Sequence, residues 1–181
     1  KCDMYLTGNY AMCSDYDYLG SRSDGGFSEY CLVPSVWHFV ESKQKSVSDY
    51  SLAMVEPCTV AQHSIRKSGL IAGYSILIFG AGPIGIMAAR WAKIFGAKSV
   101  VLVDIQKEKI EFAFERGQVC LDALAEDFFE KALFYNDGKK FDVVIEGTGT
   151  GVAFDQSINL VKTFGKIVLM GNPHKDTTIK L

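Results

Sequence analysis

The most informative segment of this sequence is Gly80-Ala81-Gly82-Pro83-Ile84-Gly85. It has the spacing G-x-G-x-x-G and follows the apolar run 76–79, which is typical of a buried strand. Residues 83–95 then place apolar side chains at helical spacing and end at Gly96. A strand, a glycine turn and a helix in this order predict a phosphate-binding turn, in which free amides at the helix start face a pyrophosphate.

The residues of this turn each suit that role. Gly80 allows the tight turn, Gly82 lets the backbone approach the phosphates, and Gly85 permits close packing of the helix on the strand. Pro83 fits the first helical turn, where amides have no intrahelical partner. We predict that Gly80, Gly82, Pro83, Ile84 and Gly85 all contact the cofactor.

An acidic residue stands where the ribose of a dinucleotide would lie. Asp104 follows the apolar run 100–103, so its carboxylate can accept hydrogen bonds from both ribose hydroxyls of NAD. It would repel the 2′-phosphate of NADP, and Ile105, which we also place at the cofactor, is not followed by an arginine. NAD is therefore the predicted cofactor. The alternative is a glycine turn that only packs two elements, with Asp104 as a helix cap.

In the rest of the sequence, the pattern of apolar and polar residues changes near Pro57. After it, apolar runs alternate with amphipathic stretches, which predicts an α/β fold with a Rossmann-type, doubly wound parallel sheet. The further strands are expected at 100–103, 119–121, 143–145 and 167–170, and the further helices at 107–116, 126–135 and 152–163. Before Pro57, we expect loops, a short strand at 27–33, a helix capped by Ser48, and then a second helical run that stops at Gly69.

Composition and charge exclude several classes of protein. Of the 181 residues, 48% are hydrophobic and 22% charged, which allows a sizeable core and excludes intrinsic disorder. The net charge of −2 and the lack of a basic run make nucleic acid an unexpected partner. The uncharged stretch 68–89 is interrupted by glycines and Pro83, so we expect a buried strand and helix there and no membrane span. Five cysteines without a C-x-x-C pair indicate reduced thiols in a cytoplasmic protein.

Together these segments resemble the zinc-dependent medium-chain alcohol dehydrogenases, and within them the polyol branch that includes sorbitol and galactitol-1-phosphate dehydrogenases. The resemblance runs in the family's order through residues 20–30, 55–63, the glycine turn with Asp104, 142–149 and 165–171. It implies that residues 1–57 are the C-terminal part of a GroES-like catalytic domain and residues 58–181 an NAD-binding Rossmann domain. It also implies a fragment, without the start of the catalytic domain and the last Rossmann strand.

The resemblance implies NAD-dependent and zinc-dependent oxidation of a secondary alcohol, in a polyol or a sugar-alcohol phosphate, to the ketose. Glu56 would face the catalytic zinc, as a ligand or through its water, while the remaining ligands lie outside this chain. From the residues alone, Glu56 before Pro57 is better explained as a helix cap, and it is the resemblance that favours the zinc role. The family's other implied cofactor contacts fall on Lys109 beside the adenosine ribose, Thr148 at the strand ends, and Met170, Gly171 and Asn172 near the nicotinamide. His63 on its helix is expected to be a core histidine.

One departure from the family concerns its structural zinc, held by four cysteines spaced C-x2-C-x2-C-x7-C. Cys2 and Cys13 match the second and fourth of these positions, but Tyr5 stands at the third. A phenol replaces a thiolate poorly in a tetrahedral site, so this zinc is expected to be absent or weak.

The sequence is compatible with three functions. The first is the dehydrogenase above, a homodimer or homotetramer when full length, of which the present chain alone would be inactive. The second is a dinucleotide-binding module without catalysis. The third is a zinc-free quinone reductase of the same superfamily, which Glu56 disfavours.

Overall fold

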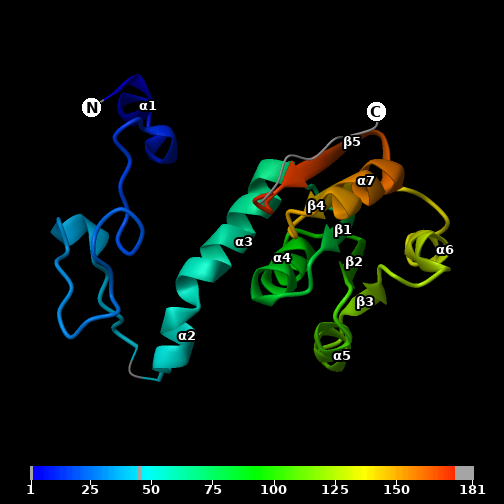
Figure 1. The fold of residues 1–181 in the computed structure, drawn as a ribbon, viewed down its shortest axis with the longest axis horizontal. Coiled ribbons are helices and arrows are strands. Elements are labelled where there is room, and N and C mark those ends of the chain that lie inside the picture. The colour runs from blue at the N-terminus through cyan, green and yellow to red at the C-terminus, as the bar shows by residue number, and fades with distance from the viewer. Residues whose placement is uncertain (1, 45, 174–181) are drawn as a thin grey trace. The chain divides into compact units, whose positions relative to one another are not determined.

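The computed structural model describes residues 2–44 and 46–173, which belong to two compact units, residues 1–47 and 48–181 (Figure 1). The predicted domain boundary lies later, between residues 57 and 58. The units divide earlier because Pro57 lies in the first turn of a helix, where its missing amide is tolerated, so the helix runs through it.

The first unit consists of short helical turns and irregular backbone. Its elements are α1 (Asp3–Leu6), η1 (Tyr10–Met12) and η2 (Val36–His38), and none of its described residues is buried. The prediction of a strand at 27–33 is wrong for this structure. Phe27, Tyr30 and Leu32 are exposed there, and the described residues provide no neighbouring strand with which the segment could pair. The assignment of residues 1–57 to a GroES-like domain stays a prediction.

The second unit begins with two helices. Ser48 caps α2 (Asp49–Ala53) by accepting a hydrogen bond from the Ser51 amide at 3.2 Å, as predicted. Helix α3 (Val55–Ser68) follows at once and ends at Gly69, whose positive φ of 66° terminates it as expected. No helix in the described part of the chain is long and apolar enough to cross a membrane.

A five-stranded parallel sheet forms the centre of this unit, which confirms the predicted fold class. The strand order is β3-β2-β1-β4-β5. The elements are β1 (Ser75–Phe79), α4 (Pro83–Ile94), β2 (Ser99–Asp104), α5 (Lys107–Glu115), β3 (Val119–Asp122), α6 (Phe128–Phe134), β4 (Phe141–Glu146), α7 (Gly151–Leu160) and β5 (Val161–Leu169).

Both faces of the sheet are covered, which explains why its central strands are apolar without alternation. Ile76 and Ile78 of β1 pack with α3 and α4 on one face, whereas Leu77 and Phe79 pack with α6 and α7 on the other. All five residues of β1 are buried. The strand therefore sits at the middle of the core and carries the glycine turn at its carboxyl end.

The last helix and strand differ in extent from their predictions. Helix α7 ends at Leu160, before the expected residue 163, and β5 already begins at Val161. The pairing of β4 with β5 shifts register between Phe141 and Val143, near the exposed Phe164 with its positive φ of 61°. Residues 167–169 of the apolar run that we expected to form a strand pair regularly with β4. Met170, the last residue of that run, lies just beyond the end of β5. An irregular strand start of this kind has no apolar signature, so the sequence pattern misses it.

Candidate functional site

A cavity of about 740 Å³ opens at the carboxyl ends of the strands in the second unit. It lies where the strand order reverses, since β2 follows on one side of β1 and β4 lies on the other. Open parallel sheets bind ligands at this point because two neighbouring loops diverge there and leave a crevice. The cavity is lined by the glycine turn, by the end of β2, by the loop after β4, and by the first part of α7.

The glycine turn has the geometry that phosphate binding requires. Gly80 adopts a φ of +102°, and a Cβ at Gly85 would lie 1.8 Å from the Gly80 carbonyl oxygen, so neither tolerates a side chain. Gly82 is the N-cap of α4, and Pro83 is the first residue of the helix. No atom lies within 4 Å of the place where a Gly82 Cβ would stand, although Gly82 lines the cavity. The space beside Gly82 is therefore free for a ligand at the helix start.

Asp104 ends β2 and is held against this turn. Its Oδ2 accepts a hydrogen bond from the Ala81 amide at 2.8 Å. Its Oδ1 accepts from the amides of Ile105 at 2.8 Å and Gln106, the N-cap of α5, at 2.9 Å. The carboxylate thus orders the start of α5 and also lines the cavity. In this geometry Asp104 can cap a helix and also accept hydrogen bonds from a ribose, so the two interpretations from the sequence are compatible.

The other residues predicted to meet the cofactor divide into two groups. Ile84, Ile105, Lys109, Thr148 and Met170 line the same cavity as the glycine turn and Asp104. Gly171 and Asn172 do not line it and instead lie against Gly149: a Cβ at Gly171 would lie 2.2 Å from the Gly149 amide nitrogen, and a Cβ at Gly149 would lie 2.5 Å from the Asn172 carbonyl oxygen. These two residues support the loop after β4.

Sequence reasoning did not single out Glu146, the last residue of β4. Its side chain is only 3% exposed, and its carboxylate accepts hydrogen bonds from the Thr148 and Gly149 amides and from the Thr148 hydroxyl. The available signal was an acidic residue that directly ends the apolar run 143–145. Glu146 ends β4 and Asp104 ends β2, so the parallel strands bring the two carboxylates to the same edge of the sheet.

Glu56 lies outside this cavity, on the first turn of α3, and its side chain is exposed. Zinc in an enzyme needs three protein ligands. In the described residues, however, no group of three or more His, Cys, Asp or Glu side chains is placed to hold a metal. The described part of the chain does not form a complete catalytic zinc site, and the zinc role of Glu56 stays a prediction.

His63 is exposed on α3, so the prediction of a core histidine is wrong. The buried positions of this helix are Ala61, Ser64, Ile65 and Ser68. Their spacing turns one stripe toward the sheet and leaves residue 63 on the opposite side.

In the first unit, Cys2 and Cys13 lie close together, with 3.5 Å between their sulfur atoms. Hydrogen bonds from the backbone at Tyr5 and Ser14, and from the Cys13 thiol, lower the pKa of Cys2 to about 6. The Tyr5 ring packs edge-on against Tyr10 at 5.0 Å between centroids. Two thiols are too few for a tetrahedral structural zinc site, so the described residues do not fit that metal.

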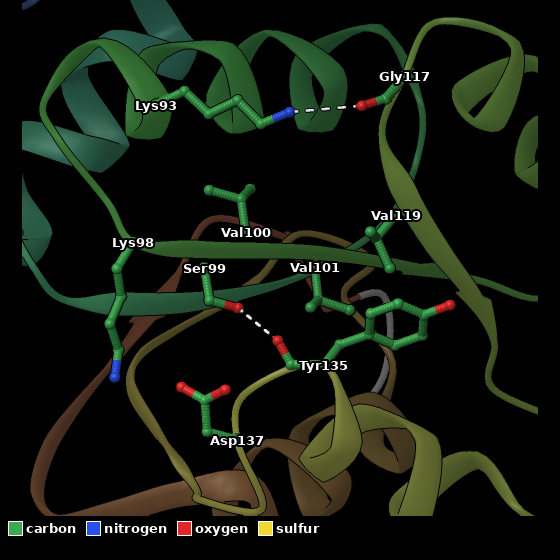
Figure 2. Close-up of a pocket in the computed structure, with 9 residues that line it drawn as sticks. All are labelled: Lys93, Lys98, Ser99, Val100, Val101, Gly117, Val119, Tyr135 and Asp137. Atoms are coloured by element: carbon green, nitrogen blue, oxygen red, sulfur yellow. Dashed lines mark hydrogen bonds between the residues drawn. The ribbon is translucent and has the colours of Figure 1, made fainter.

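A second cavity, of about 350 Å³, lies by the amino end of β2 (Figure 2). Two of its polar side chains bond within the protein: the Ser99 hydroxyl donates to the Tyr135 carbonyl at 2.8 Å, and the Lys93 ammonium reaches the Gly117 carbonyl at 3.5 Å (Figure 2). None of the residues predicted to be functional lines it. The carboxyl-edge cavity is therefore the candidate site.

Comparison with known proteins points to the same class of site. The profile of the family described as "Zinc-binding dehydrogenase" matches residues 83–181. The chain is 30% identical over 176 residues to galactitol 1-phosphate 5-dehydrogenase of Escherichia coli (strain K12), and the match covers 97% of this chain and 50% of that protein. The chain spans about half the length of the curated relatives it matches.

Solved structures share the fold over nearly all of the chain. An alcohol dehydrogenase from E. coli CFT073, complexed with NADH, is 26% identical with a TM-score of 0.86, over 99% of this chain and 52% of that one. A protein from Sinorhizobium meliloti 1021 that was crystallised bound to NADP is 28% identical with a TM-score of 0.87, over 100% of this chain and 53% of that one. Structural relatives of this chain thus include both an NADH complex and an NADP complex.

Proposed function

The chain belongs to the zinc-binding dehydrogenase family, and from this membership and the cavity at its sheet edge we propose that it is the cofactor-binding part of an NAD-dependent polyol dehydrogenase. The full-length protein would oxidise a secondary alcohol of a polyol or sugar-alcohol phosphate to the ketose. Its small-molecule substrate, its cytoplasmic location and its assembly as a homodimer or homotetramer are parts of this proposal.

The observation that carries the proposal is the glycine turn beside Asp104 at the switch point of the sheet. Free amides at the start of α4 face the open space at Gly82, where a pyrophosphate gains hydrogen bonds and the favourable helix dipole. Asp104 stands on the β2 side, where an adenosine ribose can donate its two hydroxyls to the carboxylate. The nicotinamide half then extends toward the ends of β4 and β5.

In this proposal, the residues of the chain bind and orient the cofactor. NAD supplies the chemistry by accepting a hydride from the alcohol carbon. Thr148 and Met170 line the part of the cavity left for the nicotinamide, and the apolar Val152 and Ala153 of α7 help to exclude water there. Holding the ring in one orientation matters because a misplacement of about 1 Å can cost a hundredfold in rate.

Glu56 is the residue of this chain that we propose for the catalytic zinc, with the other ligands supplied by the rest of the full-length protein. The experiment is the substitution Glu56→Gln in that protein, which keeps the size of the side chain and removes its charge. We expect lower zinc content or a polyol oxidation rate reduced by roughly tenfold or more, whereas the melting temperature of the metal-free form stays unchanged. Normal zinc content and rate with lowered melting would instead identify Glu56 as a helix cap.

The same measurements separate the alternative functions. A full-length protein that binds NAD but contains no zinc and oxidises no polyol would be a dinucleotide-binding module without catalysis. Quinone reduction without zinc would identify the third class. In both cases the proposed polyol dehydrogenase activity would be excluded.

A further inference from the structure

Glu146 is a buried carboxylate directly before Gly147, which lines the cavity, and the roles of the glycine turn and Asp104 do not explain why it is there. Its side chain is 3% exposed, and the ion pairs found in the described residues do not include it. Burying a carboxylate is costly unless its oxygens receive hydrogen bonds. The contacts that Glu146 makes therefore indicate what the residue does.

The side chain of Glu146 organises the loop after β4. Its Oε1 accepts hydrogen bonds from the Thr148 amide at 2.7 Å, the Thr148 hydroxyl at 2.5 Å and the Gly149 amide at 3.0 Å. A hydroxyl has one hydrogen, and that of Thr148 points at the carboxylate. In the 2.9 Å contact between the two threonine hydroxyls, Thr150 is therefore the donor.

These bonds continue to the start of α7. The Thr150 hydroxyl oxygen accepts a hydrogen bond from the Ala153 amide at 3.3 Å, which makes Thr150 the cap of this helix. A continuous path thus links the Glu146 carboxylate through Thr148 and Thr150 to α7. Thr148, Thr150 and Ala153 all line the cavity.

The backbone of Glu146 holds a second segment, the one after β5. Its carbonyl oxygen accepts hydrogen bonds from the amides of Met170 at 2.8 Å and Gly171 at 2.9 Å. Gly171 also lies against the side chain, because a Cβ there would stand 2.8 Å from Glu146 Oε2. One residue therefore positions both segments that bound the cavity on the β4 and β5 side.

We infer that Glu146 is a positioning residue that shapes the nicotinamide half of the cofactor cavity. The inference rests on the proposed function, because the nicotinamide side is assigned from the places of Asp104 and the glycine turn. A residue with this role affects ligands that reach the β4 and β5 side. It has little effect on ligands that occupy only the β1 and β2 side.

The test is Glu146→Gln in the full-length protein, with Asp142→Asn at the other end of β4 as the matched control. Glutamine keeps the side-chain length but replaces one carboxylate oxygen with an NH2 group, which is a hydrogen-bond donor. This group would face the backbone amide of Gly149, which is also a donor. Asp142 likewise joins two segments, through the Ser75 amide and hydroxyl, but its partner Ser75 does not line the cavity, whereas Thr148 and Met170, the partners of Glu146, do. The dissociation constants of NADH and ADP-ribose and the melting temperature are measured for each protein.

We expect Glu146→Gln to raise the dissociation constant of NADH roughly tenfold and that of ADP-ribose less than about threefold. Asp142→Asn should lower the melting temperature and change neither constant. Three outcomes would overturn the inference and leave the proposed cofactor site standing. Glu146→Gln weakens the binding of both ligands equally, Glu146→Gln leaves the binding of NADH unchanged, or Asp142→Asn changes the two dissociation constants in the same way as Glu146→Gln. If the unsubstituted protein binds neither ligand, the proposed function falls as well.

Discussion

At the scale of single residues, we propose that Asp104 determines the choice between NAD and NADP. Three backbone amides hold its carboxylate in place at the cavity, so it cannot easily turn away from a 2′-phosphate. Like charges at close range in a partly desolvated site cost on the order of a few kcal/mol. We expect NAD to bind at least about tenfold more tightly than NADP, as measured by calorimetry on the full-length protein.

The control for this prediction is Asp104→Asn, which keeps the shape of the side chain and removes its charge. The preference for NAD should then shrink, chiefly because NADP binds better. Equal dissociation constants for the two cofactors in the unsubstituted protein would contradict the prediction. The NADP complex of the relative from S. meliloti makes this comparison necessary.

The cysteines supply a second prediction at this scale. The pKa of Cys2 is lowered to about 6, whereas burial and the nearby charge of Asp104 raise the pKa of Cys120 to about 12. The thiolate is the reactive form, so at pH 7 Cys2 is largely reactive and Cys120 is not. We expect iodoacetamide to modify Cys2 well before Cys120, as followed by peptide mass spectrometry over time. Similar rates at the two positions would show that the hydrogen bonds to Cys2 do not persist in solution.

At the scale of elements, the turn between β1 and α4 distinguishes glycines needed for folding from those needed for binding. A Cβ at Gly85 would collide with the Gly80 carbonyl oxygen, whereas a Cβ at Gly82 would meet open space with an ordinary φ of −72°. We expect Gly85→Ala to destabilise the protein by about 1–3 kcal/mol or more. Gly82→Ala should fold normally but lose cofactor binding, because its methyl group occupies the place of the phosphates.

Chemical denaturation and cofactor titration of the two variants check this prediction. The variants serve as controls for each other, since they introduce the same methyl group three residues apart. If Gly82→Ala binds NADH as well as the unsubstituted protein, the phosphate site does not lie at the start of α4.

Asp142, whose carboxylate bonds β4 to β1, makes the free energy of unfolding depend on pH in the acid range. Burial alone would raise the pKa of Asp142, but hydrogen bonds from Lys162 and Ser75 outweigh it, so the pKa lies below its ordinary value of 3.8. The bonds from Ser75 measure 2.7 Å from its amide and 2.8 Å from its hydroxyl. A carboxyl with a lowered pKa in the folded state contributes stability at neutral pH, and this contribution is lost as the pH falls below about 4.

We therefore expect Asp142→Asn to cost about 1–3 kcal/mol of unfolding free energy at pH 7 and clearly less at pH 3. Urea denaturation at several pH values measures this difference. A cost that does not change with pH would mean that Asp142 contributes through its shape and not through its charge.

At the scale of the whole molecule, the described residues form the proposed cofactor cavity but not a complete reaction centre. The cavity lies entirely within the second unit, whereas the described residues contain no complete metal site. We expect residues 1–181, if purified alone, to bind NADH and to oxidise no polyol, because hydride transfer needs the substrate alcohol held next to the nicotinamide. Fluorescence titration and a polyol activity assay test the two halves of this prediction, and measurable turnover would refute the second.

Local sequence patterns were enough to predict the features that depend on neighbouring residues. The spacing of the glycines, Pro83 at the helix start and the acid after the second strand specify backbone conformation and local chemistry within a short segment, and the structure places them together at one cavity. The alternation of apolar runs likewise predicts the strands and the sheet, because period and length are local properties.

The features that join distant segments depend on how the strands and helices pack in three dimensions. Glu146 is a functional candidate because parallel pairing brings residues 146–150 next to 170–172, and Asp142 matters because it meets Ser75 across β1 and β4. His63 and the early start of β5 were misjudged for a related reason, since the side of a helix that faces the sheet and the register of a strand depend on packing. A local pattern indicates that a residue is polar or apolar, but its partner is set by the register of strands that lie far apart in the sequence.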